Sequence, residues 1–156
     1  MINILIIDDD AIFLSYLGSI FNEHNYKVKL TCKISDALVE LSNEDSQILI
    51  TDMYMPNKED GLNFIENVSK NYPQIIIIVV SGQSEINFVI KVLSEKKVYD
   101  YILKPFKTEI LKLSVEKAIE IYNLRKKKEE FIKQEETVFK DIIRSEEHTS
   151  ELQSQR

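Results

Sequence analysis

The stretch INILIIDDD at residues 2–10 decides the fold class, because a short apolar run stops abruptly at three acidic residues. Short, isoleucine-rich runs of this kind are typical of strands buried on both faces, as in parallel sheets. The arrangement recurs along the chain: QILIT leads to Asp52, IIIIVV leads to Ser81, and YDYIL leads to Lys104. The sequence therefore predicts parallel strands that each end in a polar side chain.

Segments of helical period separate these apolar runs. The predicted strands are Asn3 to Ile7, Lys27 to Leu30, Ile48 to Thr51, Ile75 to Val80 and Tyr99 to Leu103. The predicted helices are Ala11 to His24, a second helix capped by Ser35, Leu62 to Asn71 ended by Pro73, Ser84 to Glu95, and a fifth helix capped by Thr108. Five strand and helix units with right-handed crossovers are therefore expected, which is an α/β fold with one parallel sheet.

Each predicted helix has apolar residues that we expect to face the sheet. They are Ile12, Leu14, Leu17, Ile20 and Phe21; then Ala37, Leu38 and Leu41; then Phe64, Ile65 and Val68; then Ile86, Val89, Ile90 and Leu93; and finally Ile110, Leu111, Leu113, Val115, Ala118 and Ile119. Asp10 is predicted to cap the first helix.

Composition narrows the possible functions. The chain has 156 residues, which suits one domain, and its formal net charge of -6 gives no general affinity for nucleic acid. Cys32 is the only cysteine, so no intramolecular disulfide can form. There is no apolar stretch of transmembrane length and no signal peptide pattern, so we expect a cytoplasmic protein that does not bind membranes.

The fifth helix shows no stop signal near Tyr122, so the predicted domain covers residues 1–122 and a helical extension covers residues 123–143. Leu124, Phe131 and Val138 lie seven residues apart, but Lys128 and Glu135 interrupt the seam before Ile142. This pattern leaves two alternatives open: a signalling helix or short coiled coil, or a solvated helical tail.

Residues 144–156 are polar and without periodicity, and we predict a disordered tail there. The stretch from Arg144 to Ser154 resembles the translation of a common DNA-sequencing adapter, so we expect it to be non-native. In that case the natural continuation of the chain after Ile143, including any output domain, is missing.

The polar residues at the predicted strand ends should meet in one crevice, since parallel strands end at the same edge of a sheet. Asp8, Asp9 and Asp52 supply carboxylate oxygens, which suit Mg²⁺, and their mutual repulsion predicts at least one raised pKa. Asp52 stands alone at the central position and is the best candidate nucleophile for an aspartyl phosphate. Ser81 and Lys104 can donate to a phosphoryl group.

Together these residues match one family. The segments IIDDD (residues 6–10), TDMYMP (51–56), VVSG (79–82) and DYILKPF (100–106) resemble the response-regulator receiver domain of two-component signalling, in order and at near-family spacing over residues 1–122. The resemblance implies a flavodoxin-like (βα)5 fold with strand order 2-1-3-4-5 and helices on both faces.

The resemblance also implies a role for each acidic residue. Asp52 would be the phosphoacceptor, Asp9 and Asp52 would bind Mg²⁺ directly, and Asp8 would act mainly through water. The backbone carbonyl of Tyr54 would complete the metal site.

The other implied roles concern signalling. Ser81 and Lys104 would contact the phosphoryl group, and Tyr101 would be the switch aromatic that follows Ser81. The partner would be a histidine kinase or a histidine phosphotransfer protein. The output would pass through the fourth helix, fifth strand and fifth helix, with a possible homodimer through the fourth and fifth helices or the C-terminal helix.

Two other functions are considered. A phosphatase of the haloacid dehalogenase type also uses an aspartate nucleophile with magnesium, and Asp8 and Asp10 give its D-x-D spacing, but this leaves Asp52 without a role. A domain used only for dimerisation or as an adaptor, without phosphorylation, would keep the fold and lose the chemistry. The receiver function requires no enzymatic turnover beyond the chain's own phosphorylation and dephosphorylation.

Overall fold

The computed structural model describes residues 1–23, 25–82, 86–95 and 98–154. Its elements, in chain order, are β1 (Ile2–Ile7), α1 (Ala11–Ile20), β2 (Tyr26–Thr31), α2 (Ile34–Asn43), β3 (Ile48–Thr51), α3 (Lys58–Asn71), β4 (Ile76–Ser81), α4 (Ile86–Ser94), β5 (Asp100–Leu103) and α5 (Thr108–Ser154). All five predicted strands are present, and their ends lie within one residue of the predicted positions.

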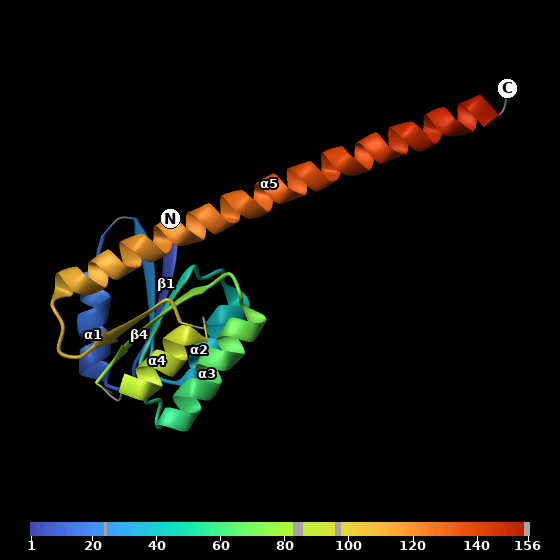
Figure 1. The fold of residues 1–156 in the computed structure, drawn as a ribbon. Coiled ribbons are helices and arrows are strands. Elements are labelled where there is room, and N and C mark those ends of the chain that lie inside the picture. Colours follow the sequence, from blue (N-terminus) through green and yellow to red (C-terminus); the bar gives the residue numbers. More distant parts are fainter. Residues whose placement is uncertain (24, 83–85, 96–97, 155–156) are drawn as a thin grey trace. The chain divides into compact units, whose positions relative to one another are not determined.

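The strands form a single sheet in the order β2-β1-β3-β4-β5, in which every neighbouring pair is parallel. Helices α1 and α5 pack against one face and α2, α3 and α4 against the other (Figure 1). This arrangement confirms the predicted α/β fold and strand order. The order reverses direction between β1 and β3, which places the carboxyl ends of these two strands at the crevice where such sheets bind ligands.

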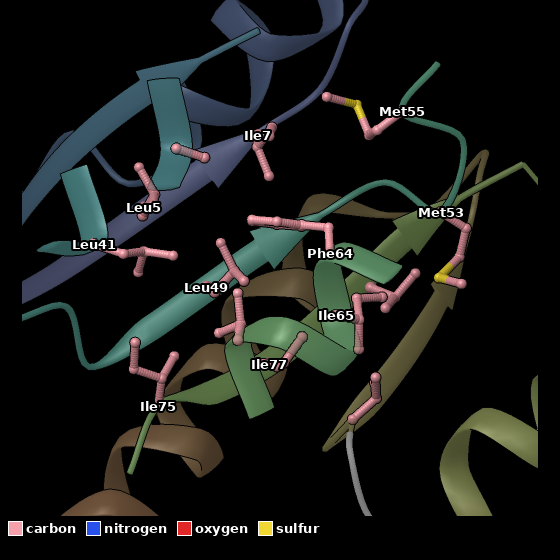
Figure 2. Packing of buried hydrophobic residues seen from close by; sticks show 14 of the residues in the cluster. Leu5, Ile7, Leu41, Leu49, Met53, Met55, Phe64, Ile65, Ile75 and Ile77 are labelled. Carbon is pink, nitrogen blue, oxygen red and sulfur yellow. The ribbon is translucent and has the colours of Figure 1, made fainter. Parts of the chain in front are cut away.

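Two hydrophobic cores fill the space between the sheet and its helices because successive strand residues point to opposite faces. Ile4 and Ile6 lie in the core beneath α1 and α5, whereas Leu5 and Ile7 lie in the core beneath α2 and α3. Figure 2 shows the second core, in which Leu5 gathers with strand and helix residues such as Phe64 of α3. Burial on both faces explains why β1, β3 and β4 are nearly continuous apolar runs.

The helix caps follow the predictions only in part. The carboxylate of Asp10 accepts hydrogen bonds from the backbone amides of Ile12 and Phe13, which confirms it as the cap of α1. The prediction for Ser35 was wrong: Lys33 is the cap residue of α2, without a side-chain hydrogen bond, and Ser35 lies inside the first turn. Thr108 is the first helical residue of α5 and does not precede the helix.

Two helix boundaries also differ from the expected ones. Helix α1 ends at Ile20, whereas the predicted end was His24. Helix α3 begins at Lys58, one turn before the predicted start at Leu62, because the side chain of Asn57 caps it by accepting a hydrogen bond from the amide of Asp60. The end of α3 at Asn71 is confirmed. The predicted start of the fourth helix at Ser84 lies outside the described residues.

Several residues expected to face the sheet are exposed. Ile12 is 85% exposed, and Ile90, Leu93, Ile110 and Leu113 are also exposed, so their predicted inward positions were wrong. The side chain of Ile86 is outside the described set. In α5 the buried residues Leu111, Val115 and Ala118 form one stripe, and Ile110 and Leu113 lie on the opposite side. These helices carry apolar residues on two faces, which a single helical period cannot separate.

Helix α5 continues to Ser154, so the disordered tail predicted from residue 144 differs from the structure. The stretch from Asn123 to Ser154 contains no glycine or proline, and residues such as Glu, Lys and Leu favour the helix. The non-native origin of residues 144–154 stays a prediction. The chain divides into two units, Met1–Tyr122 and Asn123–Arg156. Of the helices described, none is both long and apolar enough to cross a membrane.

Candidate functional site

The polar residues that follow the strands are held in place by hydrogen bonds that extend the sheet. The amide of Asp8 donates to the carbonyl of Thr31 at 3.3 Å, and the amide of Asp52 donates to the carbonyl of Ile7 at 3.2 Å. The amide of Lys104 donates to the carbonyl of Ser81 at 2.9 Å. These contacts fix the backbone of three site residues at the carboxyl edge of the sheet.

Lys104 connects two of the predicted acidic residues. Its Nζ lies 2.9 Å from Oδ2 of Asp8 and 3.2 Å from Oδ2 of Asp52, and 4.0 Å from the centre of the Phe13 ring. Asp8 is only 1% exposed, and Asp52 is also buried, so the ammonium is the internal counter-charge for both carboxylates. The peptide bond between Lys104 and Pro105 is cis.

The electrostatics of the site confirm the predicted raised pKa of an acidic group. Burial raises the pKa of Asp8 above its ordinary value, and the amide of Asp10 and the ammonium of Lys104 oppose this change. Repulsion from Asp52 is the smallest contribution, so desolvation has a larger effect than the crowding of charges. The pKa of Lys104 is raised: burial alone would lower it, but Asp8 and Asp52 together favour the charged form.

The carboxylates of Asp8, Asp9 and Asp52 form a cluster whose oxygen atoms lie within 4.8 Å of one another. Asp9 is exposed, whereas Asp8 and Asp52 are buried, so the cluster opens to solvent on the side of Asp9. Oxygen donors at this spacing fit a hard divalent cation such as Mg²⁺. Oδ1 of Asp52 accepts a hydrogen bond from the amide of Tyr54 at 3.2 Å, and a role for the Tyr54 carbonyl stays a prediction.

Ser81 and Tyr101 lie together on neighbouring strands beside the acidic cluster. Ser81 is buried at the end of β4, and the half-buried Tyr101 of β5 shares a side-chain hydrogen bond with it. Burial raises the pKa of Tyr101, the hydrogen bond with Ser81 lowers it, and the negative charge of Asp52 adds a smaller increase. All five predicted strand-end residues and Tyr101 therefore lie within one connected region.

Sequence reasoning missed Phe13, which belongs to the site through Lys104. Phe13 lies in the first turn of α1 and also packs edge-on against Phe106, with 6.2 Å between the ring centres. A lysine over an aromatic ring gains a favourable cation–π interaction and loses freedom to move. No spacing rule in the sequence links residues 13 and 104, so only the fold could have revealed this contact.

Gly61 also shapes the site, from the buried side of α3. A Cβ atom at this position would lie 1.7 Å from the backbone oxygen of Met53, which no structure tolerates. The absence of a side chain lets the first turn of α3 approach the loop that follows Asp52. The position of this loop therefore depends on a glycine that the sequence analysis did not assign to the site.

The chain is thus a doubly wound α/β domain whose acidic cluster and lysine lie at the carboxyl ends of its strands, where such sheets bind ligands, and its carboxylates suit a divalent cation. Residues 4–116 match the family model of the response regulator receiver domain. The chain belongs to this family.

Individual relatives agree with this assignment. The chain is 28% identical over 127 residues to a putative NtrX-like response regulator of Rickettsia bellii. The aligned region covers 81% of this chain and 26% of the relative. It is 30% identical over 126 residues to the hydrogenase transcriptional regulatory protein HoxA of Bradyrhizobium diazoefficiens, covering 81% of this chain and 26% of the relative. The chain thus spans about a quarter of the length of these relatives.

Among solved structures, the fold resembles that of a CheY-like response regulator receiver domain protein from Methanospirillum hungatei, with a TM-score of 0.73 and a sequence identity of 23%. The match covers 80% of this chain and 98% of the Methanospirillum chain. The receiver family binds Mg²⁺ at an acidic pocket. Receiver domains of NtrX and NtrC relatives are typically non-catalytic signalling domains.

Proposed function

We propose that this chain is a phosphorylation-dependent switch that accepts a phosphoryl group on Asp52. The observation that carries the proposal is the convergence of Asp8, Asp52 and Lys104, in which one ammonium bridges two buried carboxylates from separate strands. A salt bridge that only stabilised the fold would not need the further exposed carboxylate of Asp9 in the same cluster. The phosphodonor would be a histidine kinase or a histidine phosphotransfer protein.

In this proposal Asp9 and Asp52 hold Mg²⁺ directly, Asp8 acts mainly through water, and the carbonyl of Tyr54 completes the site. When bound, Mg²⁺ would neutralise the carboxylates and polarise the phosphoryl oxygens. A carboxylate oxygen of Asp52 attacks phosphorus, the bond from phosphorus to the donor breaks, and the donor keeps the bonding electrons. Lys104 and Ser81 then donate to the new phosphoryl oxygens.

The signal would leave the site through Ser81 and Tyr101. Their hydrogen bond joins the end of β4 to β5, so a phosphoryl group that engages Ser81 changes the partner available to the Tyr101 hydroxyl. The helices beside β5 carry exposed apolar residues at Ile90, Leu93, Ile110 and Leu113. We assign these residues to the output surface, because exposed apolar groups favour docking of a partner or a second copy. A homodimer could use this surface or the C-terminal helix.

The partner that delivers the phosphoryl group would dock beside α1. Ile12 is highly exposed in the first turn of this helix, directly after the acidic cluster, and Tyr16 is exposed one turn further. An apolar residue in this position adds little to folding and is available to a docking protein.

The position of Asp10 argues against a phosphatase of the haloacid dehalogenase type. That chemistry would require Asp8 and Asp10 to act together, but the carboxylate of Asp10 caps α1 and is not among the clustered carboxylates of the described residues. Asp52, which that mechanism leaves without a role, lies inside the cluster.

The proposal is tested by phosphorylation with radiolabelled acetyl phosphate and Mg²⁺. We expect stoichiometric, acid-stable and base-labile labelling of the chain, abolished in Asp52→Asn. Asp36→Asn, which removes an exposed carboxylate from the first turn of α2, is the matched control and should label normally. Equal labelling of Asp52→Asn and the unmodified chain would refute the assignment of the phosphoacceptor.

A further inference from the structure

A cavity of about 580 Å³ opens between α2, the loop after β3 and α3. Ile34 and Leu38, four residues apart on one face of α2, form one apolar wall. Met55 of the loop and Phe64 of α3, both labelled in Figure 2, form the other. These two side chains are only 2% and 3% exposed, so the second core holds this wall in place. The volume lies within the range of about 300–1,000 Å³ that is typical of small-molecule sites.

The cavity also lies at the edge of the sheet where folds of this kind bind ligands. Asp9 follows β1 and Cys32 follows β2, and both line it. Ligands of doubly wound sheets bind outside the carboxyl ends of the strands, close to the point where the strand order reverses, which here lies between β1 and β3. Because Asp9 belongs to the acidic cluster as well, an occupant of the cavity would lie beside the candidate metal site.

The charged groups of the lining favour a cation. Asp9 and Asp60 bring two carboxylates to the cavity, against the single ammonium of Lys33. Lys33 is exposed, and its long side chain can extend into solvent. Within the described part of the chain, neither Asp9 nor Asp60 forms an ion pair. A phosphate or carboxylate ligand would be repelled by both side chains, whereas an ammonium group would be attracted by both.

Asp60 is the carboxylate best fixed for holding such a group. Its backbone amide donates to Oδ1 of Asn57, and Nδ2 of Asn57 donates to Oδ2 of Asp60, both at 2.9 Å. This reciprocal pair holds the carboxylate in one orientation, so a ligand loses little affinity in ordering it. Asn63 and Asn67 line the cavity from the same helix and offer amide oxygens for further ammonium hydrogens.

We propose that this cavity binds a small primary ammonium compound with an aryl or branched alkyl body. The ammonium lies beside Asp60, and the apolar body packs between Leu38, Met55 and Phe64. Binding requires neither Mg²⁺ nor phosphorylation of Asp52, so this inference goes beyond the proposed function. The concentration of a small molecule could then act on the same domain that accepts the phosphoryl group.

Cys32 provides a direct readout of occupancy, because it is the only cysteine, is exposed and lines the cavity. Its alkylation by iodoacetamide, a reagent without charge, is followed by mass spectrometry in EDTA at increasing concentrations of phenethylammonium. We expect a saturable loss of alkylation. The neutral isostere 2-phenylethanol should need about tenfold higher concentrations for the same protection, and the anion 3-phenylpropionate should give none.

Three variants locate the ligand by titration calorimetry. Asp60→Asn keeps an oxygen for the contact with Asn57 and should weaken phenethylammonium about fivefold in Kd, without changing the affinity for 2-phenylethanol. Glu59→Gln removes an equal charge from the exposed neighbouring residue and is the matched control. Asn63→Trp, at an exposed position of the lining, should fill the cavity and abolish binding of both probes. Thermal unfolding checks that each variant is folded.

Three results would overturn the inference. The first is the absence of saturable protection of Cys32 by phenethylammonium, tryptammonium and isopentylammonium up to about 10 mM. The second is equal protection by 3-phenylpropionate, and the third is an unchanged Kd in Asp60→Asn. Asp52→Asn distinguishes this inference from the proposed switch: we expect it to lose labelling by acetyl phosphate and to keep the protection of Cys32, so each proposal can fail separately.

Discussion

Replacement of Lys104 by methionine should destabilise the protein in the absence of divalent cations. Methionine keeps an unbranched apolar side chain that can lie against the ring of Phe13 but removes the ammonium that bridges Asp8 and Asp52. Asp8 would then keep only the amide of Asp10 as a hydrogen-bond donor among the contacts described. A buried carboxylate without its counter-charge is strongly unfavourable.

The magnitude follows from the geometry. Charges separated by 2.9 Å and 3.2 Å attract by roughly 5 to 6 kcal/mol for each pair at an effective dielectric constant of about 20, before desolvation is subtracted. Loss of one partner from a fully buried pair costs about 3–5 kcal/mol. Because the Lys104 side chain is 23% exposed, water screens part of the attraction, and we expect a loss of about 2–4 kcal/mol.

Urea denaturation at pH 7 in EDTA and in excess MgCl₂ measures this effect. Mg²⁺ should stabilise Lys104→Met more than the unmodified protein, since a cation at the cluster can replace the missing ammonium. If the variant binds Mg²⁺ tenfold more tightly than the unmodified protein, saturating Mg²⁺ adds about 1.4 kcal/mol more to its free energy of unfolding. Lys107→Met, at an exposed position three residues away, is the control. A change below about 0.5 kcal/mol in EDTA, or equal stabilisation of both proteins by Mg²⁺, would show that Lys104 is not the internal counter-charge.

Three further predictions concern residues around the site. Phe13→Leu should slow labelling by acetyl phosphate severalfold, because Lys104 loses a cation–π contact worth about 0.5–2 kcal/mol; labelling at the normal rate would exclude a positioning role. Gly61→Ala should destabilise the fold by more than about 2 kcal/mol in urea denaturation, because its Cβ would overlap the Met53 carbonyl, and near-normal stability would contradict the close approach. The raised pKa of Tyr101 means that the folded protein binds the hydroxyl proton more tightly than the unfolded chain does. The free energy of unfolding should therefore be unaffected by this group below pH 10 and should fall as pH rises through the raised pKa. Tyr101→Phe should show a weaker fall, and an equal fall would show that another group is responsible.

The strands and the place of the site could be predicted because both depend on local sequence. Runs such as IIIIVV can be buried on both faces only in a sheet covered by helices, and the polar residue after each run must then lie at one edge. Asp8, Asp52 and Lys104 come from three different strand ends, yet their convergence follows from the parallel arrangement alone. The cap prediction that is confirmed, Asp10, also depends on contacts within three residues.

The errors concern features that depend on tertiary contacts. Ile12 and Ile110 were placed inward because they fit a helical period, but the sheet covers only one face of each helix and their neighbours Leu14 and Leu111 occupy it. Phe13 was missed for the same reason, since its partner Lys104 is far away in the sequence. Hydropathy shows that a residue is apolar and cannot show whether it packs inside the domain or remains for a partner.

Lys104 explains how the proposed switch could join its chemistry to its output. Its side chain neutralises Asp8 and Asp52, while its backbone amide donates to Ser81 at 2.9 Å, and Ser81 in turn shares a hydrogen bond with Tyr101. A phosphoryl group on Asp52 adds charge and acceptor oxygens where this ammonium already lies, so the hydrogen bonds of Lys104 and Ser81 must be redistributed. Since Ser81 supplies a hydrogen-bond partner for the side chain of the half-buried Tyr101, the environment of the Tyr101 hydroxyl must change as well. The same contacts that stabilise the site without a divalent cation therefore provide the route by which its phosphorylation would reach β5.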